Sequence, residues 1–364
     1  MLKKITMEDL GYNDFFESSR KKLGLDNFDV ARVIVEHREA YKIKNANGEY
    51  LAKITGSLMF SASSREDYPA VGDWVAATIL DAEHAAIHNI LPRKTIIKRK
   101  HSNKKRTGGK DEIQIIATNI DIAFIAESIG RDFNLNRFER YFAIASDGGV
   151  KPVIILNKID LISDEELDLK LAEIKNRFNE VEIVPSSSIN EEDLGELRKY
   201  IEKGKTYCFL GSSGVGKSSL INKLLGEDII KTKSINLRSG RGRHVTTARQ
   251  MYFLANGGIV IDNPGMREVA IADAGAGIDT LYDEITDLAQ KCKFADCTHV
   301  NEPGCTVLAA LKSGGLAADK YSNYINLKKE ARYYEMNELE KREKDRQFGK
   351  FVKKAKQQVK KYKY

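Results

Sequence analysis

The chain has 364 residues, of which 42% are hydrophobic and 30% are charged, and its net charge is +7. This length and composition predict a globular protein of two or three domains. No run of about 18 apolar residues is present and no apolar block follows the first lysines, so we expect neither a membrane span nor a signal peptide.

The distribution of charge is more informative than its sum. Residues 98–110 form a basic, glycine-containing run, and residues 350–364 contain seven lysines and no acid. Runs of this kind often contact nucleic acid, although a solvated linker and a solvated tail have the same composition.

Short alternating segments follow a helical lead-in over residues 1–28. They occupy residues 31–35, 40–43, 49–54, 71–79, 84–90 and 95–98. Five or so short strands in one segment predict a small closed β-barrel over residues 29–105, and an OB-type barrel is the first choice. A five-stranded SH3-like barrel fits the same pattern nearly as well.

Residues 111–275 alternate between apolar strands and amphipathic helices, which predicts an α/β domain with a sheet covered on both faces. Strands are expected at 120–126, 151–156, 181–184, 206–210, 250–254 and 258–261, and helices at 136–146, 165–178, 193–202 and 218–225. Residues 276–364 read as a helical domain that contains a cysteine cluster and the basic tail.

Residues 211–218 match the phosphate-loop pattern G-x-x-x-x-G-K-S, between an apolar strand and a helix. Glycines there let backbone N–H groups and the helix N-terminus face phosphates. We expect Lys217 to reach the β- and γ-phosphates, as a candidate catalytic residue, and the Ser218 hydroxyl to bind Mg²⁺. A chance glycine-rich turn is the alternative, and this context makes it rare. The candidate binding residues are Gly211, Ser212, Ser213, Gly214, Val215, Gly216, Lys217, Ser218 and Ser219.

Asn157, Lys158 and Asp160 form the pattern N-K-x-D directly after the strand at 151–156. The Asp160 carboxylate can accept hydrogen bonds from N1 and N2 of guanine, and adenine lacks both donors. Ser187 and Ser188 follow the next strand and are candidates to offer a backbone N–H to guanine O6. An ordinary serine-rich turn is the alternative for these two residues.

Asp262 and Gly265 belong to the pattern D-x-P-G after the strand at 258–261. We expect Asp262 to hold a Mg²⁺-bound water and the Gly265 N–H to sense the γ-phosphate. The basic segment 231–247 reads as a switch loop, and Thr246 or Thr247 is expected to be the second protein ligand of Mg²⁺.

Met266 occupies the position where many GTPases carry a water-orienting glutamine, and a thioether cannot orient water. We therefore expect slow intrinsic hydrolysis and a need for help. His244 in the switch loop is a candidate catalytic residue, since histidine can position water near neutral pH. A phosphate or RNA contact, or a solvated loop position, is the alternative for His244.

The cysteine cluster has the pattern C-x4-C-x-H-x5-C, formed by Cys292, Cys297, His299 and Cys305. Three thiolates and one imidazole suit a tetrahedral Zn²⁺, and four protein ligands leave no open position. We therefore expect one structural zinc ion. Cys208 lies in the strand before the phosphate loop and is expected to be a core residue.

The base-reading motif precedes the phosphate loop, the reverse of the usual order. With this order the chain resembles the RsgA/YjeQ family of circularly permuted GTPases that depend on the small ribosomal subunit. The residues that carry the resemblance, besides the motifs above, are Gly72–Val75, Asn136–Phe138, Gly242–His244 and Glu302–Gly304. Val245 and Asn263 depart from the family pattern, in which threonine is usual at both positions.

The resemblance implies an OB-fold, a permuted GTPase domain and a zinc-containing helical domain. It also implies GTP hydrolysis stimulated by the small ribosomal subunit during its late maturation, with rRNA contacts from the flanking domains. We further expect a monomeric, cytoplasmic protein. Two other functions remain open at this point: a nucleic-acid-binding protein with a merely structural nucleotide site, and a P-loop kinase or ATPase.

Overall fold

The computed structural model describes residues 5–37, 40–101, 112–130, 133–178, 181–230, 249–262 and 275–336, and the single residues 340, 343 and 346. The chain divides into two compact units, residues 1–99 with 113–269 and residues 100–112 with 270–364. In the parts of the chain that are described, no helix combines the length and the apolar character needed to cross a bilayer.

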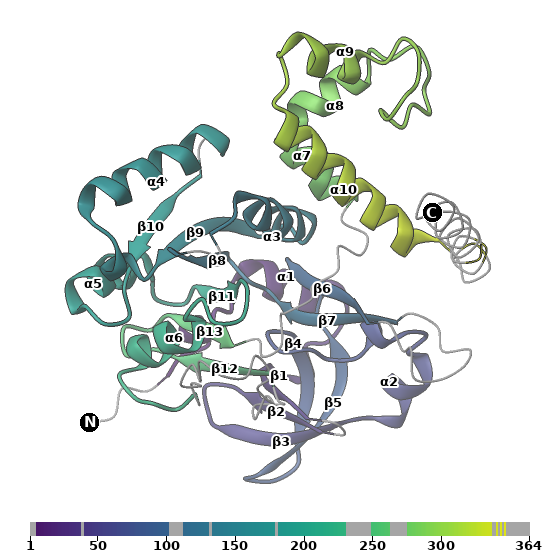
Figure 1. Ribbon diagram of the computed structural model, residues 1–364. Coiled ribbons are helices and arrows are strands. Elements are labelled where there is room, and N and C mark those ends of the chain that lie inside the picture. Colours follow the sequence, from purple (N-terminus) through teal and green to yellow (C-terminus); the bar gives the residue numbers. More distant parts are fainter. Residues whose placement is uncertain are drawn as a thin grey trace, which may run out of the picture. The chain divides into compact units, whose positions relative to one another are not determined.

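Five strands of the first unit close into a β-barrel (Figure 1). They are β1 (Asp29–Glu36), β2 (Tyr41–Lys44), β3 (Glu49–Ile54), β4 (Trp74–Ile79) and β5 (His84–Ile90). Their order is β1-β2-β3-β5-β4, and β4 returns to pair with β1. β3 and β5 are parallel while the other pairs are antiparallel. This arrangement confirms the OB-type barrel over the SH3-like alternative.

Local hydrogen bonds and caps explain the turn between β2 and β3 and the packing of the N-terminal lead-in. Asn45 Oδ1 accepts hydrogen bonds from the backbone N–H groups of Asn47 and Gly48, which closes the turn between β2 and β3. Helix α1 (Asp14–Lys22) begins at an Asn13 cap and places Phe16 against the fully buried Trp74. The lead-in therefore packs in a second apolar cluster that includes Trp74 and Ala76, separate from the cluster inside the barrel that includes Val75 and Ala77. A short helix, α2 (Gly56–Ser61), lies between β3 and β4.

The segment at 95–98 does not belong to the barrel, contrary to the sequence-based expectation. Residues 96–98 of this segment lie in β6 (Ile96–His101), which pairs with β7 (Glu112–Thr118) in a separate two-stranded sheet. The partner strand lies beyond the basic run, so local alternation could not reveal this pairing.

Six further strands continue the sheet in the order β10-β9-β8-β11-β13-β12. Strands β8, β9, β10, β11 and β13 are parallel, and β12 is antiparallel to β13. All five residues of β11 are buried, which requires cover on both faces. The strands are β8 (Ile122–Ser128), β9 (Lys151–Asn157), β10 (Ile183–Ser186), β11 (Thr206–Leu210), β12 (Arg249–Phe253) and β13 (Ile259–Asp262).

Four helices accompany this half of the sheet, and α3, α5 and α6 pack against its strands (Figure 1). They are α3 (Leu135–Asp147), α4 (Asp164–Arg177), α5 (Glu191–Tyr200) and α6 (Lys217–Leu225). The carboxyl ends of β8, β9, β11 and β13 lie along one edge because these strands are parallel, and ligands bind at such edges.

The barrel and the α/β half share one continuous sheet. β12 pairs antiparallel with β1, with Glu36 opposite Arg249 and Val35 opposite Gln250. Behind this junction Arg32 is buried and donates hydrogen bonds to carbonyl groups of Leu10, Gly72 and Asn119 and to Thr206 Oγ1. Burial lowers the pKa of the Arg32 guanidinium to about 10, against the opposing charges of Asp121 and Asp73.

We predict that Arg32→Met will destabilise the first unit by about 3 kcal/mol, because buried acceptors on both sides of the junction lose their donor. Urea unfolding at pH 7 measures the change, and Lys53→Met, at an exposed position of β3, is the control. A loss of less than about 1 kcal/mol would mean that water replaces the guanidinium and that the side chain does not join the two halves.

In the second unit, the described residues from 275 onward are mostly helical. It contains α7 (Gly275–Leu281), α8 (Asp283–Ala289), α9 (Thr306–Ser313) and α10 (Ala318–Glu335). Ile278, Tyr282, Ile285 and Val307 are fully buried, and Asn323 Nδ2 donates to the Tyr282 hydroxyl. The cysteine cluster lies between α8 and α9, next to this small apolar core in the chain.

Candidate nucleotide site and metal cluster

The phosphate loop connects the end of β11 to the start of α6. Gly211 and Gly216 have φ angles of +139° and +98°. A Cβ atom at Gly211 would lie 2.2 Å from the Ala126 carbonyl oxygen, and one at Gly216 would lie 2.3 Å from Asn157 Nδ2. Both glycines are therefore required by conformation and by space. The loop's backbone and the N-terminus of α6 offer N–H donors suited to an anion.

The structure brings the base-reading motif against the phosphate loop, although the two are far apart in sequence. Asn157 Nδ2 donates to the Val215 carbonyl at 2.7 Å, and Lys158 Nζ donates to the Gly214 carbonyl at 2.8 Å. Lys158 adopts a left-handed conformation with a φ of +64°. The two motifs therefore belong to one candidate site.

Asp160 and Ser187 also lie together. Ser187 Oγ donates to Asp160 Oδ1 at 2.5 Å, and Ser187 Oγ accepts from the Ile189 N–H. Ser187 is buried, Ser188 is half-buried, and Asp160 is exposed at the end of the sheet. The hydrogen bond from Ser187 holds Oδ1 of the Asp160 carboxylate in place. The direction in which Oδ2 points is therefore also set, as recognition of a base edge requires.

Lys217 begins α6, and its Nζ donates to the carbonyl groups of Gly211 and Ser212, both at 2.6 Å. Burial lowers the pKa of the Lys217 amine to about 8, and the charges of Asp262 and Glu127 oppose this shift. Ser218 and Ser219 follow in the first turn, half-buried, and Asp262 is buried at the end of β13.

Glu127 is a charged residue near this site that the sequence analysis missed. It lies near the carboxyl end of β8, is buried, and forms an ion pair with Arg137 at 3.3 Å. Burial raises the pKa of its carboxyl group, and Arg137 opposes the shift. An acid that ends an otherwise apolar strand was the available signal.

Four of the candidate site residues lie outside the described residues. They are His244, Thr246, Thr247 and Gly265.

The cysteine cluster forms as the spacing predicts. The ligand atoms of Cys292, Cys297, His299 and Cys305 all lie within 4.8 Å of one another, and the cysteines are free thiols. Cys292 Sγ and Cys305 Sγ lie 3.6 and 3.5 Å from His299 Nδ1. Tyr321 donates its hydroxyl to the His299 carbonyl and so supports the histidine loop. The four side chains can bind a metal ion.

A parallel sheet with a phosphate loop after its central strand, and with a base reader earlier in the chain, defines a circularly permuted P-loop GTPase. The family model described as RsgA GTPase matches residues 90–272. The chain belongs to the RsgA GTPase family and is a GTP-hydrolysing enzyme. This family assignment confirms the resemblance and sets aside the kinase or ATPase alternative.

Two curated relatives span most of the chain. "Small ribosomal subunit biogenesis GTPase RsgA 2" of Lactiplantibacillus plantarum is 42% identical, over 88% of this chain and 89% of that protein. "Small ribosomal subunit biogenesis GTPase RsgA 1" of Bacteroides thetaiotaomicron is 38% identical, over 95% of each.

Two solved structures have the same fold. YjeQ from Thermotoga maritima has a TM-score of 0.58 and 25% identity, covering 82% of this chain and 96% of that chain. YloQ, described as a circularly permuted GTPase, has a TM-score of 0.57 and 19% identity, covering 84% and 95%. The second likeness supports the fold alone.

Proposed function

We propose that this chain hydrolyses GTP as a late maturation factor of the small ribosomal subunit, binds its rRNA and is stimulated by the subunit. The contact between the base reader and the phosphate loop carries the proposal. It occurs in a chain whose relatives are named small ribosomal subunit biogenesis GTPases. The OB-type barrel supports RNA binding, since such barrels bind oligonucleotides on one face.

In this proposal each site residue has one task. Asp160 reads guanine N1 and N2 with support from Ser187 and Ser188, and Lys217 binds the β- and γ-phosphates. Mg²⁺ bound with GTP would neutralise charge on the phosphate oxygens. The remaining assignments are Ser218 and Thr247, or Thr246, as magnesium ligands, Asp262 on a magnesium-bound water, Gly265 on the γ-phosphate, and His244 on the attacking water.

The same proposal assigns a separate role to each of three regions of the chain. Residues 29–105 would contact RNA, residues 111–275 would hydrolyse GTP, and residues 276–364 would hold zinc and a basic tail. We infer that the protein works in the cytoplasm as a monomer.

Turnover with purified small subunits tests the function. We expect the subunits to raise GTP turnover by at least about tenfold, because the partner would complete a site that lacks a water-orienting glutamine. A non-hydrolysable GTP analogue should also support tighter subunit binding than GDP does. Equal binding with both nucleotides would refute the proposal, and absent turnover with and without subunits would favour a structural nucleotide site. Large subunits serve as the control.

We propose that the cysteine cluster binds one structural zinc ion. Zn–S bonds of about 2.3 Å in a tetrahedron place sulfur atoms about 3.8 Å apart. Cys292 Sγ and Cys305 Sγ are separated by 3.8 Å. Four protein ligands leave no position for a substrate.

We predict that Cys297→Ser will remove the zinc and unfold the cluster region, because the binding free energy of a structural zinc is also folding free energy, about 10 kcal/mol or more. Elemental analysis should find one zinc per chain in the natural protein and less than half of that in the variant. Hydrogen exchange across residues 275–336 reads out the unfolding. Lys312→Ser, on an exposed position of α9, is the control. Unchanged protection in a zinc-free variant would contradict the structural role.

A further inference from the structure

Strand β12 lies between the barrel and the nucleotide site. On one side it meets the end of β1, with Gln250 opposite Val35 and Arg249 opposite Glu36. On the other side Gln250 lies opposite Asp262, the last residue of β13. Along this row one residue of β12 therefore separates the barrel from the buried carboxylate that we expect to hold a magnesium-bound water.

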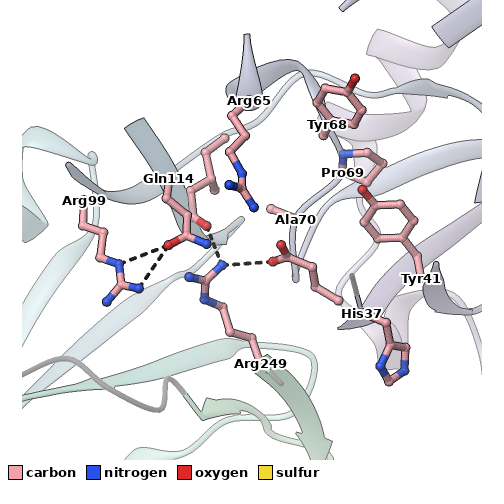
Figure 2. Close-up of a pocket in the computed structure, with 11 residues that line it drawn as sticks. His37, Tyr41, Arg65, Tyr68, Pro69, Ala70, Arg99, Gln114 and Arg249 are labelled. Carbon is pink, nitrogen blue, oxygen red and sulfur yellow. Dashed lines mark hydrogen bonds and ion pairs between the residues drawn. The ribbon is translucent and has the colours of Figure 1, made fainter. Parts of the chain in front are cut away.

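An ion pair fastens the first residue of β12 to the barrel (Figure 2). Arg249 Nη1 donates to Glu36 Oε2 at 3.0 Å and to the Ile115 carbonyl of β7 at 2.9 Å. Side-chain exposure is 12% for Arg249 and 25% for Glu36, so water and salt screen this pair less than a surface pair. One guanidinium nitrogen thus joins β12 to the barrel and to the β6–β7 sheet.

A second guanidinium group lies beside Arg249. Arg99, on β6, donates its Nε and Nη2 to Gln114 Oε1 at 3.2 and 3.1 Å (Figure 2). Burial lowers the pKa of Arg99, and the charge of Arg249 lowers it further, so the two cations repel each other. Glu36 attracts Arg249 against this repulsion. The place of Arg249 therefore depends on a charge that the barrel supplies.

The ion pair borders unfilled space. Glu36 and Arg249 both line a cavity of about 470 Å³, and Tyr41 and Tyr68 stand on its far side (Figure 2). Close-packed cores resist rearrangement, whereas side chains at a cavity wall can move without displacing others. The register between β1 and β2 also shifts within residues 33–35, directly before Glu36. The end of β1 thus has the room and the irregular pairing that a shift relative to β12 requires.

We propose that Arg249 is a positioning residue that couples the nucleotide site to the barrel through its ion pair with Glu36. A change at Asp262 between the GDP and GTP states shifts β12, and the ion pair passes that shift to the end of β1. The coupling acts equally in both directions. Its consequence for the small subunit rests on the proposed function: a subunit that binds the barrel would favour the GTP state.

Hydrogen exchange without subunits tests the coupling by itself. Residues 29–36 are followed in protein saturated with Mg²⁺ and either GDP or a non-hydrolysable GTP analogue. In the natural protein, exchange of β1 should differ between the two states by about threefold or more, because β1 is tied to the strand beside Asp262. Glu36→Gln and Arg249→Met should abolish this difference.

Two further variants separate positioning from general stability. Arg249→Lys should keep the difference in exchange, because a single nitrogen makes both bonds of the arginine. Glu49→Gln is the matched control, since it removes another barrel carboxylate, which pairs with Lys42 and Lys44. An ion pair that is merely structural would, when removed, speed the exchange of β1 by the same factor in both nucleotide states.

The affinity of small subunits with the GTP analogue, divided by their affinity with GDP, measures the consequence for the partner. Coupling between two sites typically changes affinity about 5–150-fold, and the ratio should fall to about threefold or less in Glu36→Gln and Arg249→Met. Equal binding by the natural protein would refute the proposed function, and the exchange experiment would still decide the coupling.

The inference is overturned if β1 of the natural protein exchanges alike with GDP and the GTP analogue. It is equally overturned if Glu36→Gln and Arg249→Met both keep the natural difference. An undiminished affinity ratio in these two variants would remove the ion pair from any role in subunit binding.

Discussion

Replacing Asp160 with asparagine should convert a guanosine-selective site into one that prefers xanthosine nucleotides. Guanine presents N1–H and the N2 amino group, and a carboxylate accepts from both. An asparagine in its place directs an amide N–H₂ toward those donors. Xanthine carries a carbonyl oxygen in place of the amino group, and the amide can donate to it.

The bond from Ser187 fixes the orientation on which this exchange depends. Ser187 Oγ donates to Asp160 Oδ1, so an asparagine at this position keeps the bond by placing its oxygen there. The amide nitrogen then takes the place of the second carboxylate oxygen. The variant should therefore retain the shape of the pocket and change only its hydrogen-bond polarity.

The expected effect is large. Each charge-assisted hydrogen bond is worth roughly 1.5–3 kcal/mol, so GDP affinity should fall about 100-fold or more. XDP affinity should rise, and the GDP-to-XDP preference should change by about 10³-fold. Calorimetry with GDP, XDP and ADP measures it. Asp164→Asn, an exposed carboxylate in the same region, is the control. Unchanged GDP affinity in the Asp160 variant would show that this carboxylate does not read the base.

Motifs that are contiguous in sequence predicted the residues of the candidate site better than they predicted the buried residues packed around it. The phosphate loop and the base reader were visible because their residues lie next to one another, and the parallel strands then bring them into contact. Glu127 was harder to find: an acid near the end of an apolar strand was the available signal, but its importance comes from burial near Lys217, which that pattern alone does not show.

The same distinction applies to the fold. Alternation and turns predicted the barrel strands, because each depends on neighbouring residues. The β1–β12 junction joins residues far apart in the chain, and the β6–β7 pair spans the basic run between its two strands. Arg32 shows the limit clearly: an arginine in a strand reads as a surface residue, and only the assembled sheet reveals it as a buried link between Leu10 and Thr206.

Replacing Lys217 with alanine should lower GTP turnover about 10²–10³-fold without weakening the fold. The amine is the one cation that the phosphate loop itself supplies to the β- and γ-phosphates, where charge develops during hydrolysis. Its Nζ donates to the Gly211 and Ser212 carbonyls, so the side chain lies over the loop.

The lowered pKa of Lys217 predicts whether the Lys217→Ala substitution stabilises or destabilises the folded chain. Burial lowers it from 10.5 to about 8, so at pH 7 the folded chain carries a charged amine in a place that disfavours charge. Between pH 8 and about 10.5 the unfolded chain binds more protons than the folded chain, so stability rises with pH. Lys217→Ala removes this destabilisation, and its urea midpoint at pH 7 should equal or exceed that of the natural protein. The difference should shrink as the pH rises from 8 to 10.

Subunit-stimulated turnover and urea unfolding must be measured on the same preparations, because only the combination separates function from folding. Lys223→Ala, on the exposed side of α6, should change neither quantity by much. A lower urea midpoint in Lys217→Ala would show that the two carbonyl bonds stabilise the loop more than burial of the charge costs. Turnover within threefold of the natural protein would remove Lys217 from the catalytic machinery, because a charge placed on the transferring phosphate must be worth more than that.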